Sequence, residues 1–268
     1  MPKLYCQSAR GKRLAPVRAS AGVEALYYRQ LMALIREMDD SLSYWLKANY
    51  RKVEPQIAQD SAADLLQSVM NRLTHRWRKR FDEVAEQMAQ HFSEAAAGHA
   101  DRAFAKKLAG AGFKVKFRPS PGVTNALKAT TFQNVSLIKS IAEEHMVEVN
   151  GLVMRSIIAG RDLGTLTKEL QARYGIIRRR AAFIARDQNN KATATINRTR
   201  QMELGLKEAI WVHSSAGRHP RESHVKAGRE RLRYDLSKGA LIDGQWIHPG
   251  ELPNCRCTSS VIIPGFDD

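Results

Sequence analysis

The sequence of 268 residues has little cysteine and no long apolar run. Its three cysteines are few and odd in number, which argues against a disulfide framework and for a reducing compartment. No stretch approaches the roughly 18 to 20 apolar residues that span a bilayer, and the N-terminus lacks the apolar core of a signal peptide. We therefore expect neither a secreted nor a membrane-integral protein.

Several motifs of common functional classes are also missing. The sequence contains no glycine-rich phosphate loop of the Walker type. Ser214 and Ser215 lie beside His213, but no acid or oxyanion element is placed around them, so they do not indicate a catalytic triad. No helix-turn-helix pattern with a recognition helix is evident, which argues against a regulatory DNA-binding protein.

Positive charge, in contrast, is abundant. The formal net charge is +16, and basic residues recur along the whole chain rather than in one tail. Such a balance favours an anionic partner, and nucleic acid is the first candidate. A solvated helix face is the alternative explanation for the two densest basic runs. The candidate contacts with DNA phosphates are Arg76, Arg78, Lys79, Arg80, Arg178, Arg179 and Arg180.

The first two-thirds of the chain has the periodicity of long amphipathic helices, with apolar residues every three or four positions. Proline and glycine at 119–122 mark an internal boundary, preceded by a short strand over 114–118. Asp162 is a candidate N-cap for a short helix that ends at Gly175, and Gly205 stops the next helical run. The expected divisions are a flexible basic arm over 1–20, helical regions over 21–118 and 123–205, and a terminal module over 206–268.

The terminal module changes period and becomes rich in turns. Alternation around Trp211 predicts a strand, and Asp243-Gly244 predicts a two-residue hairpin. Pro220 suits the start of a short helix that Gly228 closes, and residues 255–263 read as a last strand. We expect Trp211 and Trp246 in the core. The fold class is thus α+β, with a mostly helical N-terminal two-thirds and a small mixed α/β C-terminal module.

The order of several motifs resembles the phage Mu F-like minor head (head morphogenesis) protein family over roughly half of the chain. Residues 138–160 are similar to its pre-domain, the run Arg-Ala-Ala-Phe-Ile-Ala-Arg over 180–186 to its helix, and 249–257 to its closing Pro-Gly-Glu and Asn-Cys-Arg-Cys motifs. On this resemblance the structural signature comprises Arg186, Trp211, His224, Gly228, Trp246, Cys255, Arg256 and Cys257.

The resemblance implies a virion component, located inside the head near the portal after assembly in the host cytoplasm. Its expected partners are the portal protein, other capsid or scaffold proteins, and DNA bound without sequence preference. It implies head assembly and DNA packaging or ejection rather than an enzymatic activity, and no membrane contact. Two departures favour a structural module: Asp187-Gln188 replaces the family's usual Thr-Glu pair, and residues 216–219 lack its usual acid.

The histidines and cysteines of the terminal module could also bind a metal ion, although the sequence predicts no cofactor. Zinc is the metal that these residue types favour, but their spacings fit no common finger or ribbon. The candidate ligands are His224, His248, Cys255 and Cys257. The alternative function is a metal-dependent nuclease or other DNA-acting enzyme, with His224 or His248 as base or ligand and Asp243 or Glu251 holding the metal.

Overall fold

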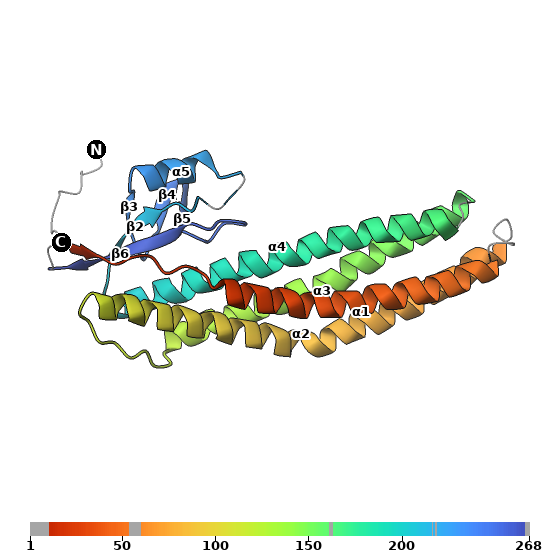
Figure 1. Cartoon of the computed structure of the whole chain (residues 1–268), viewed down its shortest axis with the longest axis horizontal. Helices are drawn as coiled ribbons and strands as arrows, with labels where there is room; N and C mark the ends of the chain where they lie inside the picture. The colour runs from red at the N-terminus through yellow and green to blue at the C-terminus, as the bar shows by residue number, and fades with distance from the viewer. Residues whose placement is uncertain (1–10, 54–59, 161–162, 216, 218, 266–268) are drawn as a thin grey trace. The chain divides into compact units, whose positions relative to one another are not determined.

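Four long helices precede a small module of strands with one short helix in the computed structural model, which describes residues 11–53, 60–160, 163–215, 217 and 219–265 (Figure 1). This architecture confirms the predicted α+β fold class. None of the described helices combines the length and apolarity needed to cross a bilayer. The helices are α1 (Ala21–Val53), α2 (Asp60–Gly110), α3 (Pro121–Ile158), α4 (Leu163–Glu203) and α5 (Glu222–Arg229). The strands are β1 (Gly11–Arg13), β2 (Glu208–Val212), β3 (Arg233–Asp235), β4 (Ala240–Ile242), β5 (Gln245–Ile247) and β6 (Thr258–Pro264).

The chain folds as two compact units, each made of segments that are distant in the sequence. The first, called the helical unit here, comprises residues 24–92 and 130–185. The second, called the mixed unit, comprises residues 1–23, 93–129 and 186–268. A unit is therefore not one continuous stretch of sequence, because α2, α3 and α4 each contribute residues to both.

The helical unit is held together by apolar faces on its helices. In α1, for example, Ile35, Met38 and Leu42 recur at helical spacing and are almost completely buried. A buried polar contact also joins two of these helices. The Tyr27 hydroxyl donates to Asn134 Oδ1 over 2.9 Å and thereby joins α1 to α3. The unit is thus a packed bundle of helices, as the periodicity predicts.

The mixed unit contains a four-stranded antiparallel sheet in the order β1-β6-β2-β3 and a separate β4-β5 hairpin. β2 alternates buried and half-buried residues, so that Ala209 and Trp211 point into the core. Trp211 is 1% exposed and lies opposite Ser259 of β6. Trp211 belongs to a core cluster that also contains Leu14, Val17, Phe104, Leu108, Ala227, Tyr234, Leu236, Ile247, Cys255, Cys257 and Val261.

Helix α4 is longer than the sequence predicts, because it passes through Gly175 without a break. A glycine inside a helix destabilises it by about 1 kcal/mol relative to alanine. The long helical segments on both sides of Gly175 compensate for this cost. The expected stop at Gly205 is confirmed. Gly205 has φ +73°, and the amides of Gly205 and Leu206 donate to the carbonyls of Met202 and Gln201, as in a Schellman motif. The predicted cap Asp162 lies outside the described residues.

Gln188, which falls on the apolar face of α4, is buried and donates to Asp187 Oδ2 at 3.4 Å. The hydrogen-bond partner that a buried Gln188 requires is therefore its neighbour Asp187 on the same helix. Further buried polar side chains follow along α4, namely Asn189, Thr193, Asn197, Arg200 and Gln201.

Two segments differ from the sequence-based expectation at the edge of the mixed unit. Residues 11–13 of the expected flexible arm form β1 on the edge of the sheet, and Leu14 and Val17 are buried. Residues 1–10 lie outside the described residues. Segment 114–118 is not a strand, although Phe113, Val115 and Phe117 alternate toward the core. Alternation shows that one side is buried, but it does not supply a neighbouring strand for a hydrogen-bonded ladder.

The hairpin prediction at Asp243-Gly244 is confirmed, since both residues have positive φ and β4 pairs with β5 on either side. The prediction that Trp246 lies in the core is wrong. Trp246 is 59% exposed and lies opposite Leu241 on the outer face of the hairpin. The inner face is occupied instead by Ile242 and Ile247.

Two boundaries in the terminal module also shift. α5 begins at Glu222 rather than Pro220 and ends at Arg229, so Gly228 lies inside the last turn and does not close the helix. The left-handed position after the helix belongs to Arg231. The predicted strand over 255–263 begins only at Thr258, which leaves both cysteines of the Cys-x-Cys motif in the preceding loop.

Candidate metal centre

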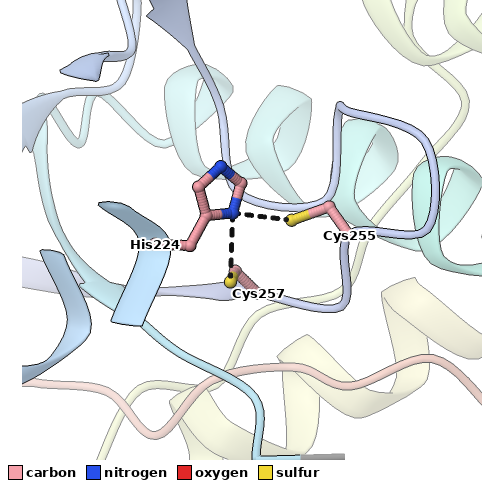
Figure 2. Close-up of side chains that lie close together, drawn as sticks. All are labelled: His224, Cys255 and Cys257. Atoms are coloured by element: carbon pink, nitrogen blue, oxygen red, sulfur yellow. Dashed lines mark hydrogen bonds between the residues drawn. The ribbon is translucent and has the colours of Figure 1, made fainter. Parts of the chain in front are cut away.

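Three of the candidate ligand residues meet inside the mixed unit. His224 lies in the first turns of α5 and is 3% exposed, whereas Cys255 and Cys257 belong to the loop before β6 and are 4% and 5% exposed. Figure 2 shows the imidazole of His224 directed between the two thiols. His224 Nδ1 lies 3.5 Å from Cys255 Sγ and 3.7 Å from Cys257 Sγ.

The thiols interact with each other as well as with the histidine. A hydrogen bond from Cys257 lowers the pKa of the Cys255 thiol well below its usual range, against the opposing effect of burial. The same hydrogen bond, together with burial, raises the pKa of the Cys257 thiol. The pair therefore holds one thiolate at neutral pH far more readily than isolated cysteines would.

Trp211 forms the inner wall of the site. Its ring packs edge-on against His224, with centroids 5.0 Å apart and planes at 79°. Among the described residues the indole N–H has no conventional hydrogen-bond acceptor, but it approaches Cys257 closely enough to lower the pKa of that thiol. A donor in this position stabilises negative charge on the Cys257 sulfur.

Helix α5 sits close to β2 because Gly228 lacks a side chain. A Cβ at Gly228 would lie 2.3 Å from the Cβ of His213, far inside van der Waals contact. Only glycine permits this approach, and it brings the helix that carries His224 down onto the strand that carries Trp211. The signature residues Trp211, His224 and Gly228 thus serve one local packing arrangement.

Residues of α4 hold in place the loop before β6 that carries Cys255 and Cys257, called the cysteine loop here. The buried carboxylate of Asp187 accepts the backbone N–H of Asn254 at 2.6 Å, and Asn254 has a positive φ of 59°. Arg186 donates to the Asn254 side chain at 3.4 Å. At Gly250, φ is +86° and an added Cβ would lie 2.8 Å from Ala194. These contacts determine the path of the loop, which therefore does not depend on the cysteines alone.

His248, the fourth candidate ligand, does not join the cluster. Its Nδ1 lies 3.3 Å from the carboxylate of Glu251, and its Nε2 lies 3.1 Å from the carbonyl of Leu236. Burial lowers the pKa of His248, and the positive charge of Arg198 lowers it further. His248 thus contributes to the loop turn rather than to the group around His224. Arg256, between the two cysteines, is half-buried.

A cavity of about 300 Å³ adjoins the cluster and reaches the surface beside exposed residues. His224, Cys255 and Cys257 form part of its wall, together with His213 and His219. Within the described part of the chain, these three are the one group of histidine, cysteine and acidic side chains close enough to share an ion. Asp243 and Glu251 do not belong to it, so the carboxylates that a nuclease would need lie elsewhere.

The basic candidates for DNA contact all lie in the helical unit, on α2 and α4. Five of the seven are exposed and form no ion pair within the described part of the chain: Arg76, Arg78, Lys79, Arg178 and Arg179. Arg80 is exposed but lies 3.9 Å from Glu37. Arg180 is half-buried, forms an ion pair with Glu144 and donates to Ser140, so much of its charge is already neutralised within the protein.

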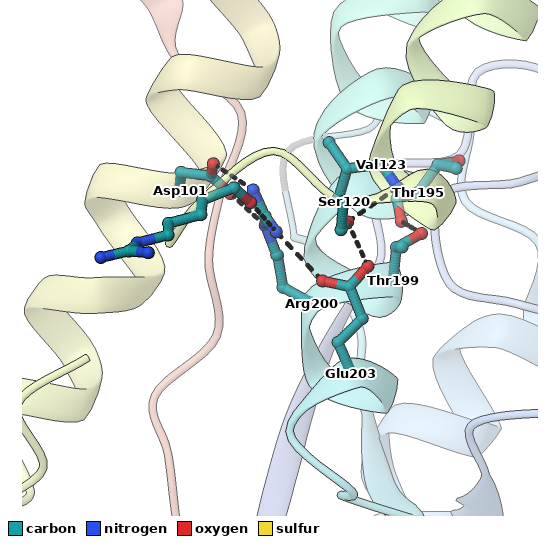
Figure 3. A network of polar contacts seen from close by, with 8 residues as sticks. Asp101, Ser120, Val123, Thr195, Thr199, Arg200 and Glu203 are labelled. Carbon is teal, nitrogen blue, oxygen red and sulfur yellow. Dashed lines mark hydrogen bonds and ion pairs between the residues drawn. The ribbon is translucent and has the colours of Figure 1, made fainter. Parts of the chain in front are cut away.

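Sequence reasoning missed a second polar centre in the mixed unit, around Arg200 of α4 (Figure 3). The guanidinium donates to Asp101 of α2, to Glu203 of α4 and to the carbonyl of Arg118. Ser120, at the start of α3, donates to Glu203 and extends the network. Arg200 was missed because a basic residue in a helical run is normally expected on the solvent-exposed face. The role of Asp187 was missed for a similar reason, since it was visible only as a departure from the family pattern.

Comparison with known proteins finds one family model and one relative that are similar to this chain. Residues 147–260 match the family model described as Phage Mu protein F like protein. An uncharacterized protein of Haemophilus influenzae is 30% identical over 268 residues, covering 98% of this chain. The chain spans 57% of the length of that relative. No solved structure matches the chain.

Proposed function

We propose that the chain is a minor head protein of a tailed phage or prophage, because residues 147–260 match the family model described as Phage Mu protein F like protein. The matched segment contains the whole of α4 and α5, and it carries the cluster of His224, Cys255 and Cys257. This coincidence of family match and buried signature is the observation that supports the proposal most directly.

We further propose that the protein acts inside the head near the portal vertex, where it assists assembly and DNA packaging or ejection. Its partners would be the portal protein, other capsid or scaffold proteins, and DNA. The net charge of +16 supports contact with DNA, because a protein confined with packaged DNA meets phosphates on all sides. The exposed basic side chains of α2 and α4 are the natural contacts.

The role proposed for the C-terminal module is structural rather than enzymatic. Four of its signature residues are buried together: His224, Cys255 and Cys257 lie side by side, and the ring of Trp211 packs against His224. Catalysis by metal-assisted hydrolysis needs a position for substrate and an activated water, usually with carboxylates or histidines around the ion. Neither Asp243 nor Glu251 lies in the cluster, and this supports the structural role over the nuclease.

A gene deletion tests this function. In the phage or prophage that encodes the chain, removal of its gene should reduce the yield of DNA-filled heads, counted by electron microscopy of a purified lysate. Expression of the wild-type chain from a plasmid should restore the yield, and a variant carrying Trp211→Ala should not, because its module is destabilised. Normal numbers of filled, infectious heads in the deletion strain would contradict the proposed function.

A further inference from the structure

The cluster of His224, Cys255 and Cys257 has the geometry of a metal site. We propose that these three side chains bind one zinc ion through His224 Nδ1, Cys255 Sγ and Cys257 Sγ. The inference concerns the chain's own chemistry and does not depend on the role in the phage head. The site is formed by residues from two separate elements, α5 and the loop before β6.

The distances between the ligand atoms fit tetrahedral zinc. With zinc–sulfur bonds of about 2.3 Å and a zinc–nitrogen bond of about 2.0 to 2.1 Å, tetrahedral angles place nitrogen and sulfur about 3.5 Å apart. The observed separations from Nδ1 are 3.5 Å and 3.7 Å. All three ligand atoms lie within 4.8 Å of one another, which accommodates the sulfur–sulfur separation of about 3.8 Å expected for such a site.

The nearly equal distances also distinguish a metal site from a simple hydrogen bond. A neutral imidazole nitrogen has one lone pair and accepts from one thiol, so a plain core would need only one sulfur beside Nδ1. Here Nδ1 faces both sulfurs, and Nε2 is buried with no hydrogen-bond partner among the described residues. The tautomer with hydrogen on Nε2 leaves the Nδ1 lone pair directed at the space between the sulfurs.

The surroundings favour thiolate and provide a fourth position. The thiols of Cys255 and Cys257 are hydrogen-bonded to each other, and the indole N–H of Trp211 approaches Cys257. Zinc ligation requires deprotonated sulfur, and a hydrogen-bond donor beside a sulfur stabilises its negative charge. The adjoining cavity of about 300 Å³ leaves room for a water molecule or a histidine of the 213–219 segment as the remaining ligand.

The loop that carries the cysteines is organised before any ion binds. The contacts of Asn254 with Asp187 and of Gly250 with Ala194 set its path. Bound zinc would then connect α5 to this loop, whose two cysteines are free thiols. The ion would take the place of a covalent link between the two elements.

Metal analysis of the 268-residue chain tests the proposal. Protein purified without chelators from cells grown with zinc should contain about one zinc per chain. Cys255→Ser, Cys257→Ser and His224→Gln should each lose most of it. The matched controls His75→Gln and His248→Gln should keep it, because they remove the same residue type from described positions outside the cluster. Wild-type protein without zinc, or controls that lose it as the cluster variants do, would overturn the proposal.

Substitution with cobalt covers the case in which a cluster variant fails to fold. Wild-type protein stripped of metal and given Co²⁺ alone should show the visible bands of tetrahedral cobalt and a thiolate-to-cobalt charge-transfer band. Stoichiometric Co²⁺ should saturate both signals, and added Zn²⁺ should abolish them. Absence of the charge-transfer band would overturn the site, because cobalt would then be bound without these cysteines or not at all.

Discussion

The guanidinium of Arg200 holds both carboxylate oxygens of Asp101 at 2.8 Å, in the bidentate arrangement that suits a guanidinium and a carboxylate. The Arg200 side chain is only 5% exposed, and hydrogen bonding to Asp101 raises its pKa, so it remains charged inside the mixed unit. Phe117 packs against the guanidinium, with Cζ 4.9 Å from the ring centroid. This pair joins α2 to α4 and supports the helix that anchors the cysteine loop.

Removing one partner of this pair should therefore be costly. Asp101→Asn leaves a buried guanidinium with only Glu203 as countercharge, and we expect a loss of about 3 kcal/mol in the free energy of unfolding, the low end for a buried pair. Asp101 is 26% exposed, which limits the loss. Urea denaturation measures it. The matched control Asp82→Asn removes a carboxylate that is 54% exposed and should cost less than about 1 kcal/mol. Equal losses in both variants would contradict this account.

The two tryptophans of the terminal module should respond in opposite ways. Trp211→Ala removes a fully buried ring and should cost about 3 to 5 kcal/mol, enough to make the module sensitive to protease. Trp246→Ala removes a ring that is 59% exposed and should change stability by about 0.5 kcal/mol or less. Thermal melting and limited proteolysis of both variants provide the comparison. A destabilised Trp246→Ala protein would mean that the ring is buried after all.

This contrast illustrates what the sequence could and could not establish. Both tryptophans lie in strand-like runs with apolar neighbours, and the pattern alone placed both in the core. Which face of a two-stranded hairpin is buried depends on the pairing register of its strands and on the core against which it packs; here the buried face carries Ile242 and Ile247. The three residues of β5 alone determine neither the register nor the packing. Helices were easier to predict, since their period repeats over dozens of residues.

The candidate site was predicted in composition but not in arrangement. His224, Cys255 and Cys257 were all named from the sequence, as was His248. Which three meet depends on the approach of α5 to β2 at Gly228 and on the loop path set by Asp187. Both are contacts over long sequence separations. A glycine that closes a helix and one that allows close packing look the same in sequence.

The helical unit should lose stability in mild acid through His145. Burial lowers the pKa of this histidine to about 4, and Arg173 adds to the effect. The unfolded chain takes up the proton near the ordinary value of 6.5, so this contribution is fully present above pH 6.5 and is lost as the pH falls toward 4, by up to about 3 kcal/mol. Burial raises the pKa of Asp39 to about 6, which acts in the opposite direction.

The measurement must therefore compare variants rather than read one curve. Between pH 7 and 4, the stability of His145→Gln should decline less than that of the wild-type protein. His75→Gln, which replaces an exposed histidine, should follow the wild-type curve. Parallel curves for wild-type and His145→Gln would show that His145 already takes up a proton in the folded protein.

DNA binding should be independent of sequence and strongly dependent on salt. Each phosphate contact contributes about 0.9 to the slope of log affinity against log salt. Arg178→Gln with Arg179→Gln should reduce that slope by about 1.8 if both residues contact phosphates. Lys106→Gln with Lys107→Gln makes the same charge change on exposed residues of the mixed unit and should affect the slope less. Equal effects in the two double variants would indicate that only net charge matters.

The most direct test of the central claim is quantitative mass spectrometry of DNA-filled heads purified from the phage or prophage that encodes this chain. The proposed role predicts that the chain is present in the heads, in few copies relative to the portal protein and the major capsid protein, and that it resists external protease until the heads are opened. A chain found only in the soluble lysate, and absent from purified heads, would contradict its role as a minor head protein.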